Sequence, residues 1–272
     1  MSWSKKILNT PILGDVAKKV ASVKVSHDAH NIAQHFIQFL QPEVATTTEL
    51  REEVFRIRHN VYCEELSFEP LRPDQMETDD FDAQSLFALI KHKPSNTYTS
   101  CVRLVTSSTI EELLPIEKYC RNSIEHDEFD PALFKRDEIC EISRLAVRAD
   151  FRRRQTDKYA GSATGVISES TYSETELRCF PFIAIGLYMA AASLAFKAGK
   201  KHAFVMMEPR LARSMKFVGI KFIQLGKPVD YHGLRAPYYI NAEIFMNNLT
   251  SGFQSLFRVI EADMARQLEL SN

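Results

Sequence analysis

The pattern of apolar and polar positions predicts helices and strands that alternate along the chain. Apolar residues recur at helical spacing up to about Gln41, and the segment 46–48 provides a Thr-rich start for a second helix that runs to about Tyr62. Apolar runs typical of strands follow, at residues 86–92, 100–106, 140–147, 202–207 and 220–225. The first two flank a turn at 94–96, which predicts an antiparallel hairpin.

Helices are predicted between and after these later strands. The apolar segment 181–198 ends at Gly199, and the segment 209–218 ends at Gly219, as helices with a glycine C-cap do. One helical face near the C-terminus carries Phe253, Leu256, Phe257, Ile260 and Met264, which predicts a core helix, with a dimer surface as the alternative. The polar, Ser/Thr-rich stretch 154–178 suits a surface loop or lid. We therefore expect an α/β or α+β fold with a mixed central sheet flanked by helices, divided into an N-terminal helical extension, residues 1–45, and one domain, residues 46–272.

Composition and charge narrow the functional classes. The 272 residues are 45% hydrophobic with a formal net charge of -1, so no global field favours nucleic acid or a membrane surface. The uncharged run 180–196 is diluted by alanine, glycine and proline, which favours a buried helix over a membrane span. Five widely spaced cysteines without a CxxC pair argue against a disulfide framework and a zinc site, and no export signal is apparent. We expect a cytoplasmic protein that binds no metal.

Charged residues interrupt segments that should be buried beside the sheet. Arg103 lies within the apolar strand CVRLV, and Glu141 and Arg144 flank Ile142 and Ser143 in the next strand. Side chains alternate along a strand, so Arg144 joins the face of Glu141 and Ser143 only if a β-bulge intervenes. Taken alone, this spacing favours a structural ion-pair network that ties the helix and the loop to the sheet.

Several motifs occur in one order along the chain. They are RHNVYCEELSFE at 58–69, ETDDFD at 77–82, Arg103 in its strand and EISR at 141–144. This series resembles that of the acyl-homoserine-lactone synthases. It is more similar to the long-chain N-acyl amino acid synthases and the PEP-CTERM/exosortase system-associated acyltransferases, which also show FRRR at 151–154, MEP at 207–209 and YHGLRAPY at 231–238.

The resemblance implies a bacterial acyltransferase with the GNAT-like fold. The donor would be an acyl-phosphopantetheine thioester on acyl carrier protein or coenzyme A, lying in a V-shaped opening of the sheet, with no permanently bound cofactor. The acceptor would be the α-amine of an amino acid. Homoserine-lactone synthases typically have tryptophan at the position of Phe68 and lack the 231–238 segment, which favours an amino acid over S-adenosylmethionine. An autoinducer synthase and a non-catalytic acyl-carrier or lipid-binding module remain alternatives.

The resemblance and the chemistry of amide formation assign roles to individual residues. An α-amino group is largely protonated at pH 7, so the reaction needs a base, for which Glu141 is the candidate. Arg103 and Arg144 complete the catalytic set, and arginine suits a substrate carboxylate. Backbone N–H groups freed by a bulge near residues 145–147 would stabilise the oxyanion. The remaining substrate-binding candidates are Arg58, Tyr62, Phe68, Asp79, Asp82, Leu145, Val147, His232 and Arg235, although Gly233 and Pro237 also predict a turn there.

Two further sets concern the donor. Cations downstream of the fourth strand would bind the phosphopantetheine phosphate or an acidic carrier protein. Such a run is also typical of a solvated surface. These cations are Arg148, Arg152, Arg153, Arg154 and Lys158. Apolar residues would line the acyl chain, with core packing as the alternative: Ile183, Leu187, Met189, Leu194, Phe196, Met206 and Met207. We expect His59 to be partly exposed and without a catalytic role.

Overall fold

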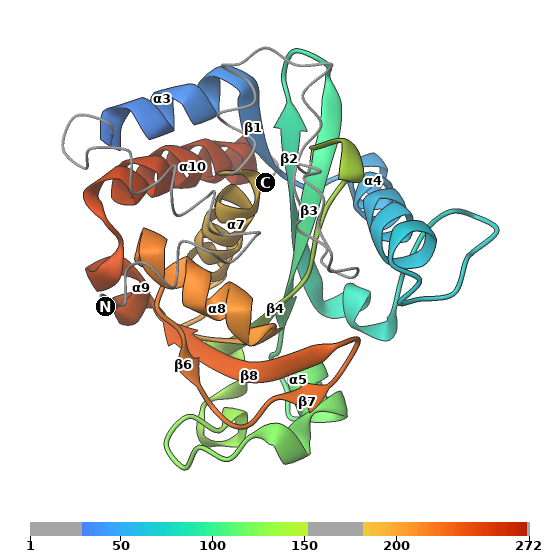
Figure 1. Ribbon diagram of the computed structural model, residues 1–272, viewed down its shortest axis with the longest axis vertical. Coiled ribbons are helices and arrows are strands. Elements are labelled where there is room, and N and C mark those ends of the chain that lie inside the picture. Colours follow the sequence, from blue (N-terminus) through green and yellow to red (C-terminus); the bar gives the residue numbers. More distant parts are fainter. Residues whose placement is uncertain (1–28, 152–181, 271–272) are drawn as a thin grey trace, which may run out of the picture.

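A mixed β-sheet runs through the centre of the protein (Figure 1). The computed structural model describes residues 29–151 and 182–270. The strands are β1 (Leu40–Val44), β2 (Ser85–His92), β3 (Thr97–Thr106), β4 (Ile139–Val147), β5 (His202–Met207), β6 (Ile223–Gln224), β7 (Val229–Asp230) and β8 (Leu234–Asn241). Their order is β1-β2-β3-β4-β5-β8-β6, with β7 beside β8. Among these described strands, β4 and β5 form the parallel pair and the other neighbours are antiparallel.

Helices cover both faces of this sheet. The helices are α3 (Ala29–Phe39), α4 (Thr48–Arg58), α5 (Pro115–Tyr119), α7 (Ile183–Lys197), α8 (Pro209–Met215), α9 (Ala242–Asn248) and α10 (Ser251–Leu270). Helix α7 packs on one face, with α10 and α3 packed around it, and its buried side chains join the main apolar core. Helix α4 lies on the opposite face and continues as a π-helical segment, His59–Glu65. The predicted mixed sheet with flanking helices is confirmed.

The N-terminal part differs from the helical prediction. Helix α3 ends at Phe39, and the next five residues form edge strand β1, which pairs with β2. The segment LQPEV alternates between buried and half-buried positions, as a strand does, and its Pro42 is tolerated because the strand lies at the sheet edge. The prediction of helix up to Gln41 is therefore wrong for its last two residues, whereas residues 1–28 lie outside the described part.

The remaining strand and helix predictions hold with two differences. The strand expected at 220–225 shortens to β6. Pro237 does not lie in a turn: it is inside β8, where its register partner is Met206 and its carbonyl accepts the N–H of Leu225 at 2.9 Å. The turn instead uses Gly233, whose φ of 92° lies in the left-handed region. The predicted loop or lid at 154–178 lies outside the described residues.

The predicted C-terminal core helix is confirmed. All five apolar residues of its predicted face are buried in α10, against α7 and α3. None of the described helices, the apolar α7 included, is long and apolar enough to span a membrane.

Candidate active site

The site lies where β4 and β5 separate. The two parallel strands pair only over 139–141 and 202–204, whereas β4 continues to Val147 and β5 to Met207. The sheet therefore opens in a V beyond Glu141 and Phe204. By strand alternation, Glu141, Ser143 and Met206 face the same side of the sheet, and they line a cleft there.

A bulge in β4 brings Arg144 into this cleft. The register of β4 against β3 shifts between the pair Arg103–Ser143 and the pair Cys101–Ala146, so β4 has one extra residue. Arg144 has a φ of 50°, and its side chain lines the cleft beside Ser143. The carbonyl of Leu145 accepts a 2.8 Å hydrogen bond from the Tyr62 hydroxyl, which holds the bulge against the π-helical segment. The bulge that the sequence required for this arrangement is present.

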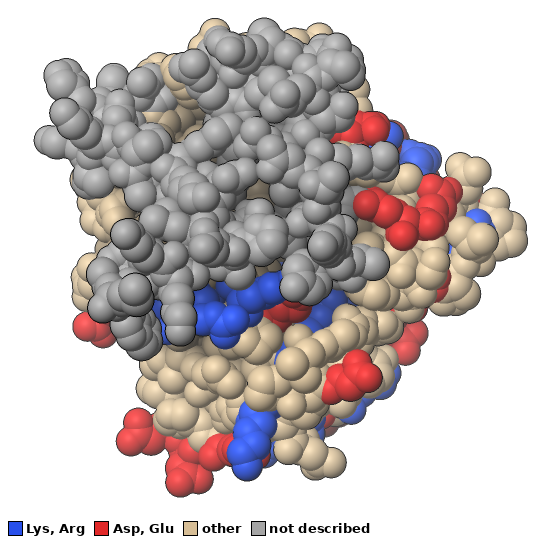
Figure 2. Space-filling view, in the orientation of Figure 1, with Lys and Arg blue, Asp and Glu red and all other residues tan. Residues whose placement is uncertain are grey.

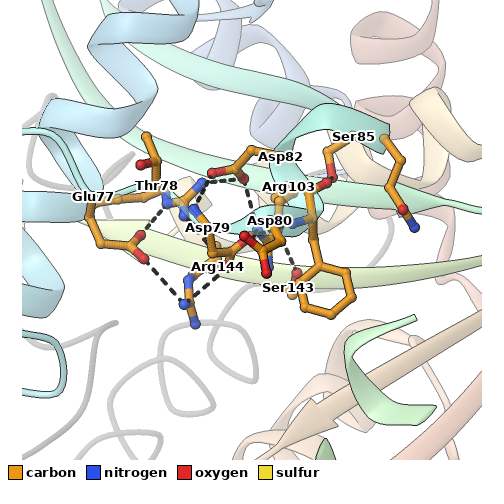
Figure 3. A network of polar contacts seen from close by, with 12 residues as sticks. Glu77, Thr78, Asp79, Asp80, Asp82, Ser85, Arg103, Ser143 and Arg144 are labelled. Carbon is orange, nitrogen blue, oxygen red and sulfur yellow. Dashed lines mark hydrogen bonds and ion pairs between the residues drawn. The ribbon is translucent and has the colours of Figure 1, made fainter. Parts of the chain in front are cut away.

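Three arginines and four carboxylates form one connected network in the wall of the cleft and behind it, and Figure 3 shows the part around Arg103 and Arg144. Arg58 donates to Glu77 and, at 2.7 Å, to Asp82. Arg103 donates to Asp79, to Asp82 at 2.8 Å and to the Ser143 hydroxyl at 3.0 Å. Arg144 donates to Glu69, Glu77 and Asp79 at 3.1–3.2 Å. The network thus joins α4, the acidic loop and strands β3 and β4.

Local hydrogen bonds pre-form the acidic part of this network. Asp79 caps the short 3₁₀ turn that follows it by accepting the N–H of Phe81, while Asp82 accepts the N–H of Asp79 at 2.8 Å. Burial raises the pKa of Glu77 and Asp79, but the neighbouring arginine charges outweigh burial and hold both pKa values below the usual range. Both side chains are therefore anionic at neutral pH and hold the arginines in place.

Glu141 has a different environment from the other carboxylates. Its side chain is buried beside the cleft, and its Oε2 accepts the N–H of Ile116, at the start of α5, at 2.7 Å. Burial raises its pKa to about 8, because that hydrogen bond and the charge of Arg103 offset only part of the desolvation. At pH 7 this carboxyl group is mostly protonated, and it titrates where a general base is effective.

The cleft has a polar floor and an aromatic rim. It contains about 480 Å³, part of it open to solvent, and a second hollow over the acidic loop adjoins it and shares six lining residues with it. Aromatic rings lie in sequence along the rim, with centroid distances of 5.0–6.3 Å: Tyr119, Tyr231, His232 and Phe68.

An apolar pocket lies on the opposite side of β4. It is a hollow of about 440 Å³ between α7 and the sheet, open solvent included, and Ile142, next to Glu141, reaches it. Helix α7 contributes Tyr188, Ala192, Ala195 and Phe196. Of the residues predicted to line an acyl chain, Phe196 lines this pocket and Met206 the polar cleft. The others are core residues that line neither hollow: Ile183, Leu187, Met189, Leu194 and Met207.

Most of the predicted site residues lie together, some of them in supporting positions. Those lining the polar cleft are Tyr62, Phe68, Arg103, Glu141, Arg144, His232 and Arg235. Arg58 and Asp82 lie behind it as buried parts of the network, and Asp79 lines the adjoining hollow. The side chain of Val147 points away into the α7 core, because the bulge reverses the alternation after Ser143.

The predicted donor-binding cations are only partly described. Arg148 follows β4 and its N–H donates to Thr99, but its side chain lines neither the cleft nor the hollow beside it. Arg152, Arg153, Arg154 and Lys158 lie outside the described residues. Figure 2 shows Lys and Arg side chains gathered over α8, which carries Arg210 and the exposed Arg213.

Sequence reasoning missed some residues of the site and misjudged the burial of His59. Glu69, Glu77, Ser143 and the N–H of Ile116 all hold the site in place. Glu77 could have been found by counting charges, since the three arginines of the network require more than the two aspartates predicted to bind there, Asp79 and Asp82. The prediction that His59 is partly exposed is wrong: it is buried, and its Nε2 accepts the N–H of Arg72 at 3.1 Å.

Comparison with known proteins gives the fold a name. The model of the family described as acetyltransferase (GNAT) domain matches residues 57–162. No curated protein matches the chain in sequence. Among solved structures, TofI in a ternary complex with an inhibitor and MTA has a TM-score of 0.56 and 16% identity, covering 78% of this chain and 96% of TofI.

Two further structures are similar. MesI, a CoA-dependent acyl-homoserine lactone synthase, has a TM-score of 0.53 and 16% identity, covering 81% of this chain and 95% of MesI. BjaI, a CoA-dependent acyl-homoserine lactone synthase solved with SAM and isopentyl-CoA, has a TM-score of 0.53 and 18% identity, covering 76% of this chain and 87% of BjaI. The strand order, the parting of β4 from β5 and these likenesses together show that this chain has the GNAT-like acyltransferase fold.

Proposed function

We propose that the protein transfers an acyl group from a phosphopantetheine thioester to the α-amine of an amino acid. The observation that carries the proposal is Glu141, a buried carboxyl group with a pKa of about 8, positioned at the point where β4 and β5 part. An edge of a split sheet can bind an extended thioester arm through free backbone groups, and a base is needed at the same place.

The proposed reaction has one chemical step. The ionised form of Glu141, directly or through a water, takes a proton from the acceptor's ammonium or attacking amine. The amine nitrogen attacks the thioester carbonyl carbon, the C–S bond breaks, and the sulfur leaves as a thiol after taking a proton. Arg103 and Arg144, held rigid by their carboxylates, keep the cleft wall in place and contribute positive charge near the developing oxyanion. Backbone N–H donors from the bulge near residues 145–147 remain a prediction.

The apolar pocket on the α7 side suits the acyl chain. Ile142 separates it from the polar cleft at the fork of the sheet, so a chain entering between the strands would reach apolar surface directly. Each buried methylene contributes about 0.8 kcal/mol. This supports a fatty acyl donor over a short acyl group.

The donor would carry its phosphate on coenzyme A or on acyl carrier protein. The cations over α8 and Arg148 supply local positive charge for either, in a chain whose net charge is only -1. MesI and BjaI are CoA-dependent enzymes, so coenzyme A is tested beside carrier protein. A PEP-CTERM-associated role stays a prediction.

A second candidate is transfer to S-adenosylmethionine. Within the described network, before Arg235 is counted, four carboxylates contact three arginines, and this local negative charge would also suit a sulfonium; BjaI was solved with SAM. Thiol release from acyl-CoA and acyl carrier protein, measured with each of the twenty amino acids and with S-adenosylmethionine, tests both. Mass spectrometry of the product separates an N-acyl amino acid from a lactone. No thiol release with any acceptor would contradict acyl transfer.

A further inference from the structure

Arg235 differs from the other arginines of the cleft. It lies on β8, opposite Val229, and its side chain lines the polar cleft together with Glu141 and Arg144. Its Nε atom is buried and has no hydrogen-bond partner, and no carboxylate of the described residues forms an ion pair with it. Arg103 and Arg144, by contrast, each contact at least two carboxylates.

An unsatisfied buried donor of this kind is costly for the free protein. Leaving a buried polar group without a partner costs about 1–3 kcal/mol, and more when the group is charged. The guanidinium cannot lose its charge, so the cost is relieved only by an anion or by water. Arg144, across the cleft, also has a buried Nε without a partner. Two arginines with free donors therefore border one space.

The charges around the cleft are balanced in number but separated in space. Glu69, Glu77, Asp79 and Asp82 are matched by three arginines of the network, and Arg235 is the fourth cation. Glu69 and Asp79 are the partly exposed acids, on the acidic-loop side, whereas Arg235 lies on β8. A ligand with both an ammonium and a carboxylate would match this arrangement without changing the net charge.

The position of Arg235 favours a carboxylate over a phosphate. In an α-amino acid one carbon joins the amine to the carboxylate, so a residue that binds the carboxylate must share the cleft of the base. Glu141 and Arg235 do share it. The phosphate of a pantetheine donor, by contrast, is separated from the thioester by the whole arm. A planar guanidinium also matches a carboxylate with two parallel hydrogen bonds.

We infer that Arg235, which faces Arg144 across the cleft, binds the α-carboxylate of the acceptor, so that the acceptor must be a free α-amino acid. This inference rests on the proposed acyl transfer and adds the group by which the acceptor is recognised. It makes Arg235 a determinant of acceptor specificity that is not itself involved in proton transfer.

The test compares each acceptor with its carboxamide. Using the purified full chain and acyl-CoA, thiol release is measured with the best acceptor from the panel and with the same compound as its α-amide. We expect wild-type kcat/KM to fall on the order of 100-fold for the amide. In Arg235→Met, KM for the acid should rise by a similar factor with little change in kcat, while kinetics with the amide stay as in wild type. Arg258→Met, on the exposed side of α10, is the matched control and should change neither.

The possible outcomes separate the inference from the proposed function. Equal use of acid and amide by the wild-type protein, or an unchanged KM in Arg235→Met, would overturn the inference while acyl transfer stands. If none of the acceptors gives thiol release, the proposed function itself is contradicted. The rise in melting temperature caused by the acid or by the amide measures acceptor binding without turnover. If Arg235→Met fails to fold, the comparison of acid and amide in the wild-type protein still decides the test.

Discussion

Among single residues, neighbouring charges give carboxylates different properties. Asp79 and Glu77 lie among arginines and have lowered pKa values, whereas Glu141, one strand away, accepts a backbone N–H in a less charged environment and has a raised pKa. The first two therefore keep a fixed negative charge, and only Glu141 changes its protonation near neutral pH. This difference suits the former to structural roles and the latter to proton transfer.

Replacing the proposed base should slow turnover strongly and remove its pH dependence. We expect Glu141→Gln to lower kcat about 10²- to 10⁴-fold. Wild-type kcat/KM should rise with pH toward a plateau above an apparent pKa of about 8, and this rise should be absent from the residual activity of the variant. Thiol release between pH 6 and 9 measures both. Glu138→Gln, at a surface ion pair with Lys201 outside the cleft, is the control, and normal turnover in Glu141→Gln would refute the role.

The two neighbouring aspartates of the acidic loop should differ sharply in their effect on stability. Asp82 joins the buried Arg58 and Arg103, so Asp82→Asn leaves buried positive charge uncompensated and should cost about 3–5 kcal/mol. Asp80 is 92% exposed and faces Lys118 at 3.6 Å, so Asp80→Asn should cost under about 1 kcal/mol. Urea unfolding measures both. Equal losses would show that the network contributes little to stability.

At the scale of elements, an irregularity in one strand builds the site. A regular β4 would direct Arg144 to the face opposite Glu141 and Ser143. The extra residue places these side chains around one cleft, and the hydroxyl of Tyr62, from the segment after α4, holds the freed carbonyl. Likewise, α5 supplies a single N–H to Glu141, although it is only five residues long.

The left-handed backbone of the bulge predicts an unusual order of stabilities. Arg144→Gly and Arg144→Ala both remove the same charge, but at φ 50° glycine avoids the strain of a side chain. We expect the glycine variant to be more stable than the alanine variant by about 0.5–1 kcal/mol. The same pair at the exposed Arg258 of α10 should show the opposite order, since alanine favours a helix. Thermal unfolding of the four variants checks this, and an alanine advantage at both positions would contradict the left-handed geometry.

The small residues of α7 should set the length of the acyl chain. Ala195 borders the apolar pocket, so in Ala195→Phe the new ring would occupy space proposed for the chain. We expect the preferred donor to shorten by several carbons while turnover of short acyl-CoA is retained. A series of acyl-CoA donors, with melting temperatures recorded beside it, measures this change. An unaltered chain-length profile in a folded variant would place the chain elsewhere.

At the scale of the whole molecule, the site ties distant parts of the chain together. The network joins α4, the acidic loop, β3 and β4, while the cleft adds β5 and β8 (Figure 1). The protonation of its carboxyl groups therefore affects the stability of the whole fold: some groups lower stability when the pH falls, and another lowers it when the pH rises.

The stability of the whole fold should be highest at about pH 5 and fall from there toward pH 8. Glu77 and Asp79 have lowered pKa values, so their contribution is fully present above their usual values of 4.5 and 3.8 and is lost as the pH falls through their folded-state pKa values. Glu141 has a raised pKa, so its contribution is lost as the pH rises from 4.5 through about 8. Chemical unfolding from pH 3 to 9 tests this. In the plot of unfolding free energy against pH, Glu141→Gln should flatten only the alkaline side and Asp79→Asn only the acid side. If either variant leaves that side of the curve unchanged, the pKa shift assigned to the replaced residue is contradicted.

Several central elements and most of the charged residues of the cleft could be predicted from the sequence, whereas β1, β7, β8 and α9 could not. Apolar periodicity indicated the hairpin, the strand of Glu141 and the two glycine-ended helices, because burial imposes these local patterns. Arg103 and Glu141 were conspicuous because charges inside apolar strands need partners. Two predictions from local patterns were wrong. Residues 40–41 were predicted as helix but belong to β1, because their apolar spacing fits both structures. Pro237 was predicted in a turn but lies inside β8, where the sheet accommodates it.

How these residues meet depends on the folded chain. The bulge at Arg144, the exclusion of Val147 from the cleft and the partners Glu69 and Ile116 depend on strand register and on contacts between segments far apart in the chain. The same holds for the raised pKa of Glu141 and the unpaired Arg235. Desolvation and ion pairing are set by neighbours in space, and one sequence read along its length does not specify those neighbours.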